Sequence, residues 1–216
     1  MNPIQVLIRK ELKVEFRSLQ GLVASAMLSF MILMSLRFSV MDSIILQNSG
    51  ILWASILLTG LGLVTHISTR ESERGTVDLL KLAPITRYQL FLGRMVGSLV
   101  LLWILSTITL VIYVILFGNP FAEDLLLAYL IVLIGCIGLS AVGTLAASSA
   151  TPLHGGWMIT SLFAIPILLF TVIEAAIRST DSLISGSSDF ELAFMLLVMY
   201  NVAFVTGGAW LSEISD

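Results

Sequence analysis

The stretch MVGSLVLLWILSTITLVIYVILF, Met95 to Phe117, decides the fold class of this chain. It holds 23 residues, none of them charged, and its apolar residues run without the alternation of a half-buried β-strand. A helix needs about 20 predominantly apolar residues to cross the hydrocarbon core of a bilayer. We therefore expect this stretch to be a transmembrane helix.

Five further apolar runs flank it, each bounded by charge, proline or glycine. They are Leu22 to Met41, Ile51 to Thr69, Leu125 to Ala147, Trp157 to Ile177 and Leu192 to Leu211. The chain of 216 residues is 57% hydrophobic and 12% charged, with a mean hydropathy of +1.02. This composition excludes an ordinary soluble domain, and the unbroken runs argue against a transmembrane barrel. The predicted fold class is an all-α integral membrane protein with six transmembrane helices.

Basic residues set the expected orientation of these spans. Nine of the 11 Lys and Arg residues precede the first span or lie between the second and the third: Arg9, Lys10, Lys13, Arg17, Arg70, Arg74, Lys81, Arg87 and Arg94. Short loops rich in Lys and Arg remain in the cytoplasm. With six spans, both termini are therefore expected on the cytoplasmic side.

Residues 1–20 carry the pattern of an amphipathic helix. Between Ile4 and Leu19 the apolar residues recur mostly at steps of three and four, while the basic side chains take other faces. A helix with an apolar stripe and a strongly charged face lies in the membrane interface rather than crossing the bilayer. A solvated helix packed on a soluble partner is the alternative.

The stretch RESERGTVDLLKLAPITR, Arg70 to Arg87, is the other charged region. Proline disfavours the α region for the residue before it, so a short helix should end at or before Ala83. Thr76 is a suitable N-cap, and Asp78 places negative charge in the first turn. A helix of about two turns is marginal alone in water, so its leucines need a surface to pack against. A cytoplasmic partner is the simplest surface, and the membrane face is the alternative.

One set of residues extends from the N-terminal helix to the start of the third span: Lys10-Glu11-Leu12, Glu15, Arg17, Gly50 to Trp53, Glu71 or Glu73, Gly75-Thr76, Asp78, Leu80, Leu82, Pro84, Leu90 and Gly93-Arg94. A second and weaker set is Gly143-Thr144-Leu145, Gly155-Gly156 and Ile165-Pro166. In these residues the chain resembles the CcmB family, the haem exporter protein B permease subunits of the ABC transporter of cytochrome c maturation, and more broadly ABC-2 type permeases. Two positions depart from the pattern: Asp78 replaces the usual glutamate, and His154 stands where a basic residue is expected.

The resemblance implies a single transmembrane permease domain over residues 1–216, with an interfacial helix at 1–20 and a cytoplasmic coupling loop at 70–90. It also implies that the loop helix is a coupling helix seated in a separate, CcmA-like ATPase subunit. The implied contacts are Glu71, Glu73, Gly75, Thr76, Asp78, Leu79, Leu80, Leu82 and Pro84. The chain has no Gly-x-x-x-x-Gly-Lys-Ser/Thr phosphate loop, so we expect ATP to bind in the partner and the chain itself to be no enzyme.

The function implied is the coupling of ATP hydrolysis to haem handling, or to release of a haem chaperone, at the outer face of a bacterial or archaeal cytoplasmic membrane. Further implied partners are CcmC-like and CcmD-like membrane subunits, the haem chaperone and membrane lipid, with a homodimer left open and no nucleic acid. We expect no catalytic, cofactor-binding or metal site in the chain. An ABC-2 permease exporting a lipid, drug or polysaccharide is the alternative. A membrane enzyme using Glu174 or His154 is a third hypothesis.

Arg37 and Glu174 are the charged residues inside the expected spans, both near the outer ends. An unpaired charge in a membrane is costly, so we expect these two to pair, with Asp42 as the other partner for Arg37. His66 and His154 are expected to be structural rather than haem ligands. Trp53, Trp157 and Trp210 lie near span ends and suggest an interfacial aromatic belt. Gly135 and Gly138 should let helices approach closely.

Overall fold

A computed structural model describes residues 3–39, 49–73, 86–118, 121, 124–149, 156–186 and 189–214. Throughout these residues the regular structure is helical. The helices are α1 (Pro3–Ser18), α2 (Gln20–Ser39), α3 (Gly50–Glu73), α5 (Arg87–Phe117), α6 (Leu125–Ser149), α7 (Gly156–Ser185) and α8 (Phe190–Ile214).

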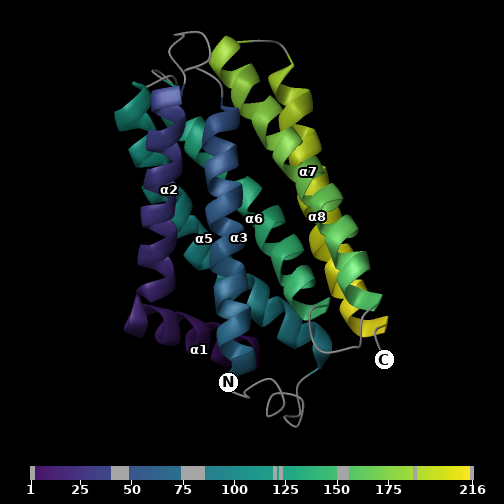
Figure 1. Ribbon diagram of the computed structural model, residues 1–216. Coiled ribbons are helices and arrows are strands. Elements are labelled where there is room, and N and C mark those ends of the chain that lie inside the picture. The colour runs from purple at the N-terminus through teal and green to yellow at the C-terminus, as the bar shows by residue number, and fades with distance from the viewer. Residues whose placement is uncertain are drawn as a thin grey trace.

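The helices form a bundle with one helix laid across its end. Figure 1 shows α2, α3, α5, α6, α7 and α8 running lengthwise, while α1 crosses below α2 and α3. Both chain ends lie toward the α1 end of the bundle (Figure 1). We call this the α1 end and the other the far end.

Each expected span coincides with a long helix of the bundle. Four described stretches are long and apolar enough to cross a membrane: Gln20–Ser39, Tyr88–Phe117, Leu125–Leu145 and Phe190–Trp210. Gly50–Val64 is apolar but shorter. An all-helical membrane protein with several spans is therefore supported, whereas the count of six stays a prediction.

Two helices, α5 and α7, extend about two turns beyond the expected spans. Helix α5 begins at Arg87 rather than Met95, because Thr86 and Gln89 form a capping box. The Thr86 hydroxyl accepts a hydrogen bond from the Gln89 amide at 3.3 Å, and the Gln89 side chain accepts one from the Thr86 amide at 3.4 Å. Helix α7 continues past Ile177 to Ser185. Each helix is followed by a glycine with positive φ, Gly118 at 73° and Gly186 at 61°.

The chain turns sharply between α1 and α2 at Leu19, whose φ is 50°. Leu19 is the one non-glycine residue with positive φ among the described residues. Its amide still donates to the Glu15 carbonyl at 2.7 Å, and its carbonyl accepts from the Val23 amide at 2.9 Å. The left-handed residue therefore redirects the chain without leaving these two backbone groups unpaired.

Trp53 occupies the centre of the packing between α3, α6 and α7. Its side chain is fully buried, and its indole N–H donates to the Thr180 hydroxyl at 2.9 Å. A Cβ added at Gly135 of α6 would overlap the Trp53 ring. The predicted close approach at Gly135 is thus confirmed. The belt position expected for Trp53 is wrong, because small residues on α6 and α7 leave room for the indole inside the bundle.

Trp210 and Trp103 differ from Trp53. The Trp210 side chain is 64% exposed on α8, as an aromatic facing lipid would be. Trp103 is half-buried and donates to the Leu133 carbonyl of α6 at 3.0 Å. The side chain of Trp157 lies outside the described residues.

Candidate docking face at the α1 end

The predicted partner contacts fall around a segment that the structure frames on both sides. Glu71 and Glu73 form the last turn of α3. The remaining positions, Gly75, Thr76, Asp78, Leu79, Leu80, Leu82 and Pro84, lie outside the described residues, so the loop helix and its contacts stay predictions. Helix α3 ends and helix α5 begins on either side of this segment, both at the α1 end (Figure 1).

Helix α1 is held against the start of α5 through an apolar contact. Leu7 of α1 is 4% exposed, and a Cβ added at Gly93 of α5 would lie 2.9 Å from both Leu7 Cβ and Leu7 Cδ1. Any side chain larger than glycine would therefore push the two helices apart. The absence of a side chain at Gly93 makes room for Leu7, a contact that the sequence pattern alone did not reveal.

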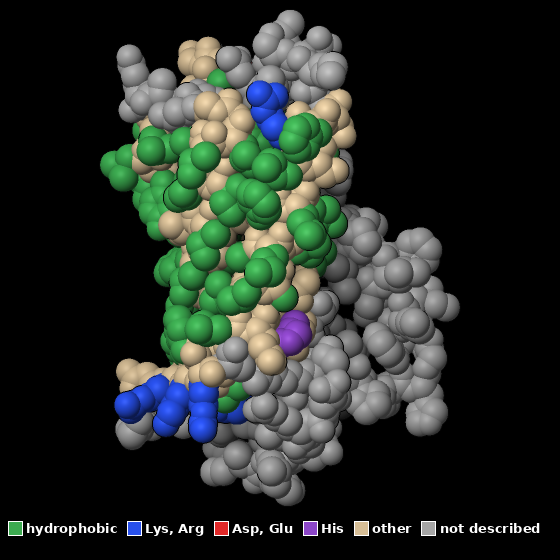
Figure 2. All heavy atoms as spheres, turned by 60° about the vertical axis from the view of Figure 1, so that its left-hand side comes forward, with side chains coloured by type: hydrophobic (Ala, Val, Ile, Leu, Met, Phe, Trp, Pro, Cys, Tyr) green, Lys and Arg blue, Asp and Glu red, His purple; other side chains and the backbone are tan. Residues whose placement is uncertain are grey.

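The charged side chains of α1 are sorted between its two faces. Arg9, Lys13 and Arg17 are exposed and recur every four residues, which places them on one side of the helix. Glu15 is only 3% exposed and lies on the inward side. Figure 2 shows the row of basic side chains directly below a broad hydrophobic surface.

Glu15 and His66 meet Gly21 at the corner between α1, α2 and α3. A Cβ at Gly21 would lie 2.5 Å from Glu15 Oε1 and 2.8 Å from His66 Nδ1. A larger residue at position 21 would therefore force these two polar side chains to move. His66 itself is exposed, and His154 lies outside the described residues.

The start of α5 also packs against α6 and α8. Phe91, Met95 and Ala141 form a small buried cluster of their own. A Cβ at Gly208 of α8 would lie 2.7 Å from Phe91 Cζ and 3.1 Å from Leu145 Cδ1. The first two turns of α5 therefore pack against α1 on one side and against α8 on another. Added side-chain atoms at Gly93 or Gly208 would meet these neighbours closely, so the start of α5 is in tight contact with α1 and α8.

At the far end, the structure gives Arg37 and Glu174 separate partners. Glu174 forms an ion pair with Arg178, 2.6 Å between Oε1 and Nη2. The Arg37 Nε donates to the Leu116 carbonyl at 3.2 Å, and its guanidinium lies 5.9 Å from the Phe117 ring centre. Helix α2 packs on α1, α3 and α5, whereas α7 packs on α3, α6 and α8. The structure therefore does not bring Arg37 and Glu174 together as a pair.

Arg178 was missed because the expected span ended one residue before it, at Ile177. The signal was present in the sequence, since residues four apart on a helix face each other and Glu174 is followed by Arg178.

Among the described residues, no group of three or more His, Cys, Asp or Glu side chains is arranged to hold a metal ion. In the part of the chain that the structure describes, the α1 end presents a packed face with a row of basic side chains.

Comparison with known proteins places this arrangement in context. The family model described as "CcmB protein" matches residues 3–211. Over 119 residues the chain is 32% identical to the probable multidrug ABC transporter permease YbhR of Escherichia coli (strain K12), and the same holds for that of Escherichia coli O157:H7. The alignment covers 55% of this chain but 32% of those proteins, so the chain matches about a third of their length. No solved structure matches.

Proposed function

The chain belongs to the CcmB family, and on that premise we propose that it is the membrane subunit of an ABC transporter whose separate ATPase docks at the α1 end. The observation that carries the proposal is that residues 74–85 are flanked by the end of α3 and the start of α5. That segment joins α3 to α5, and α5 is clamped by Leu7 on Gly93 and by Phe91 beside Gly208. A subunit bound to the segment would push directly on two of the bundle's helices.

The length of α5 suits such a role. Its 31 residues span about 46 Å, about half as long again as the ~30 Å hydrocarbon core. The part that extends beyond the core begins at the capping box of Thr86, next to the proposed docking segment. Movement imposed there would be carried along a single helix through the membrane.

The proposed topology has six spans within one permease domain of residues 1–216, with both termini in the cytoplasm. The position of both chain ends at the α1 end supports an even number of spans (Figure 1). The exposed Arg9, Lys13 and Arg17 at that end support its placement in the cytoplasm. Helix α1 then lies in the interface as a brace for the docking segment.

The proposed task is cytochrome c maturation, with haem handling or haem-chaperone release coupled to ATP hydrolysis by a CcmA-like subunit and assisted by CcmC-like and CcmD-like subunits. The family match over residues 3–211 supports this choice. A second candidate is drug export, which the identity to a probable multidrug ABC transporter permease favours.

Two measurements in the native host test these proposals. Replacing Leu79 and Leu80 together with glutamate should release the ATPase from detergent-solubilised membranes while the permease stays inserted, because buried charge opposes docking. Matched substitution of the lipid-facing Met195 and Met199 by alanine should retain the ATPase. If the ATPase stays bound to the glutamate variant, docking does not use this segment.

Deletion of the gene separates the two tasks. Loss of covalently attached haem from c-type cytochromes, with drug tolerance unchanged, supports cytochrome c maturation. Normal cytochromes together with drug sensitivity would assign the chain to drug export instead.

A further inference from the structure

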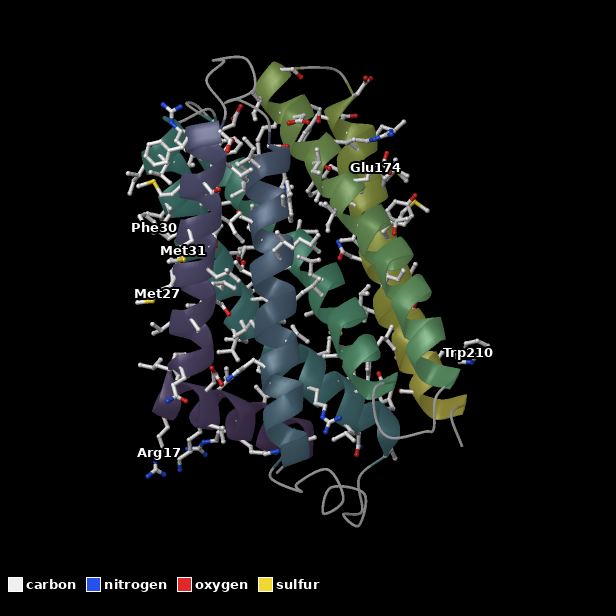
Figure 3. All side chains as sticks on the ribbon, in the orientation of Figure 1. Arg17, Met27, Phe30, Met31, Glu174 and Trp210 are labelled. Carbon is white, nitrogen blue, oxygen red and sulfur yellow. The ribbon has the colours of Figure 1, made fainter. Side chains whose placement is uncertain are left out.

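A shallow, open apolar groove lies on the outer face of α2, beside α5. It has a volume of about 370 Å³ and is lined by Val23, Ala26, Met27, Phe30 and Met31 of α2 and Ile112 of α5. Met27 is 63% exposed and Met31 is 68% exposed, so the groove is open to its surroundings. In Figure 3, Met27, Phe30 and Met31 all project to the same outer side of the bundle. Flexible methionine side chains suit an apolar occupant without a fixed shape.

The groove lies along the half of α2 that is nearer to α1. From Val23 to Met31, the helix rises about 12 Å, which is somewhat less than half of the ~30 Å hydrocarbon core. With α1 in the membrane interface, as proposed above, the groove would face the leaflet next to α1. Its length would then accommodate much of a lipid acyl chain.

Positive charge lies at the open lower end of the same groove. Arg17 projects from the corner directly below the outer face of α2 (Figure 3). Lys13 lies one turn earlier on the same exposed side of α1. The acidic Glu15 between them in sequence is buried on the inward side of α1, so the exposed side carries the basic residues. A single negative charge attached to an apolar chain would match both features.

We propose that the groove on α2 and the basic side of α1 form one binding site for an anionic phospholipid, with its phosphate beside Lys13 and Arg17 and an acyl chain against Met27 and Met31. A cytoplasmic protein could reach the basic row but not the groove. A second copy of this chain, related by an axis along the membrane normal, would cover both grooves but bring the two basic rows together. The lipid satisfies both halves of the site at once.

Position-specific quenching tests the site without any ATPase, so its outcome is independent of the proposed function. Cys136 is the sole cysteine of the chain and is buried, so a fluorophore can be placed at Met27→Cys, or at Met199→Cys on the exposed face of α8 as a control. The full chain is reconstituted in phosphatidylcholine vesicles containing one fifth phosphatidylglycerol. Either lipid carries bromine in its acyl chains as the quencher.

Quenching by brominated phosphatidylglycerol should show that this lipid is about fivefold or more enriched beside position 27 compared with position 199. The enrichment is expected because two cations lie near the groove. Lys13→Gln with Arg17→Gln should abolish that difference. Arg9→Gln, which removes a charge from the same row two turns from Arg17, should leave most of it. Equal quenching of positions 27 and 199 by phosphatidylglycerol would overturn the proposal. Protection of position 27 from both brominated lipids would overturn it too, because a protein would then fill the groove.

Discussion

Helices α6 and α2 are both long and apolar enough to cross a membrane, but they occupy opposite environments. In α6, 56% of the spanning window is buried, against 28% in α2. Helix α6 packs on α3, α5, α7 and α8, whereas α2 lies at the edge on α1, α3 and α5. Helix α6 is the more apolar of the two, with a mean hydropathy of 2.7 against 1.8, and its small side chains let neighbouring helices approach closely. Buried small residues line α6 at Gly135, Gly138, Ser140, Ala141 and Gly143.

Helix α2 instead divides its faces. Ser25, Ser29 and Leu33 recur every four residues and are buried. Between them Met27, Phe30 and Met31 are exposed. In lipid there is no hydrophobic force between helices, so close packing and hydrogen bonds decide which face points inward. Ser25 and Ser29 thus lie with Leu33 on the inner face, and Met27, Phe30 and Met31 lie on the lipid face.

The largest effect should come from filling the α6 contact. Gly135→Ala would drive a methyl group into Trp53, which is fully buried and held by Thr180, so about 1–3 kcal/mol of stability should be lost. Gly62→Ala on α3 is the matched control, because its added Cβ meets no atom within 4 Å. Thermal aggregation in detergent measures both variants. Equal stability of the two would mean that the Trp53 packing is not as described.

A smaller effect should come from the inner face of α2. The Ser29 hydroxyl is 2.8 Å from the Thr109 hydroxyl of α5, and both side chains are fully buried. A double-mutant cycle with Ser29→Ala and Thr109→Val should give a coupling energy of about 0.6 kcal/mol, the average for hydrogen bonds between membrane helices. Met31→Ala, on the lipid face of the same helix, should show no coupling to Thr109. Coupling at Met31 as strong as at Ser29 would erase the distinction between the two faces.

Much of this architecture follows from the sequence, because apolar runs locate the long helices without knowledge of their neighbours. The positions of helix ends were less accessible. The capping box at Thr86 and Gln89 was readable but lay outside the apolar run, and α7 passes through Arg178 despite its charge. In most places the sequence did not show which helix faces pack against each other. Trp53 has the position of a belt residue in sequence, and only its contacts with Gly135 and Thr180 place it inside.

The residues of the candidate docking face were also only partly predictable. The basic residues and the apolar stripe of α1 are local patterns, so they were read directly. The seating of Leu7 on Gly93, and the closing of Glu15 and His66 around Gly21, each join segments far apart in the chain. No periodicity carries that information. The coupling helix itself remains a prediction on residues outside the described part of the chain.

The smallest effect should come from the far end, where the sequence and the structure suggest different partners for Glu174. The Glu174–Arg178 pair is exposed, with side-chain accessibilities of 45% and 66%, so breaking it with Arg178→Gln should cost only about 0.3–0.5 kcal/mol. Exchanging the two residues, as Glu174→Arg with Arg178→Glu, should restore most of that loss, since the charges still face each other four residues apart. Combining Glu174→Arg with Arg37→Glu should restore nothing, because Arg37 contacts Leu116 and Phe117 on α5 instead. Thermal aggregation of the purified variants at low salt resolves the three cases. Rescue by the Arg37 combination, and not by the Arg178 exchange, would restore the pairing expected from the sequence and would require α2 and α7 to approach each other at the far end.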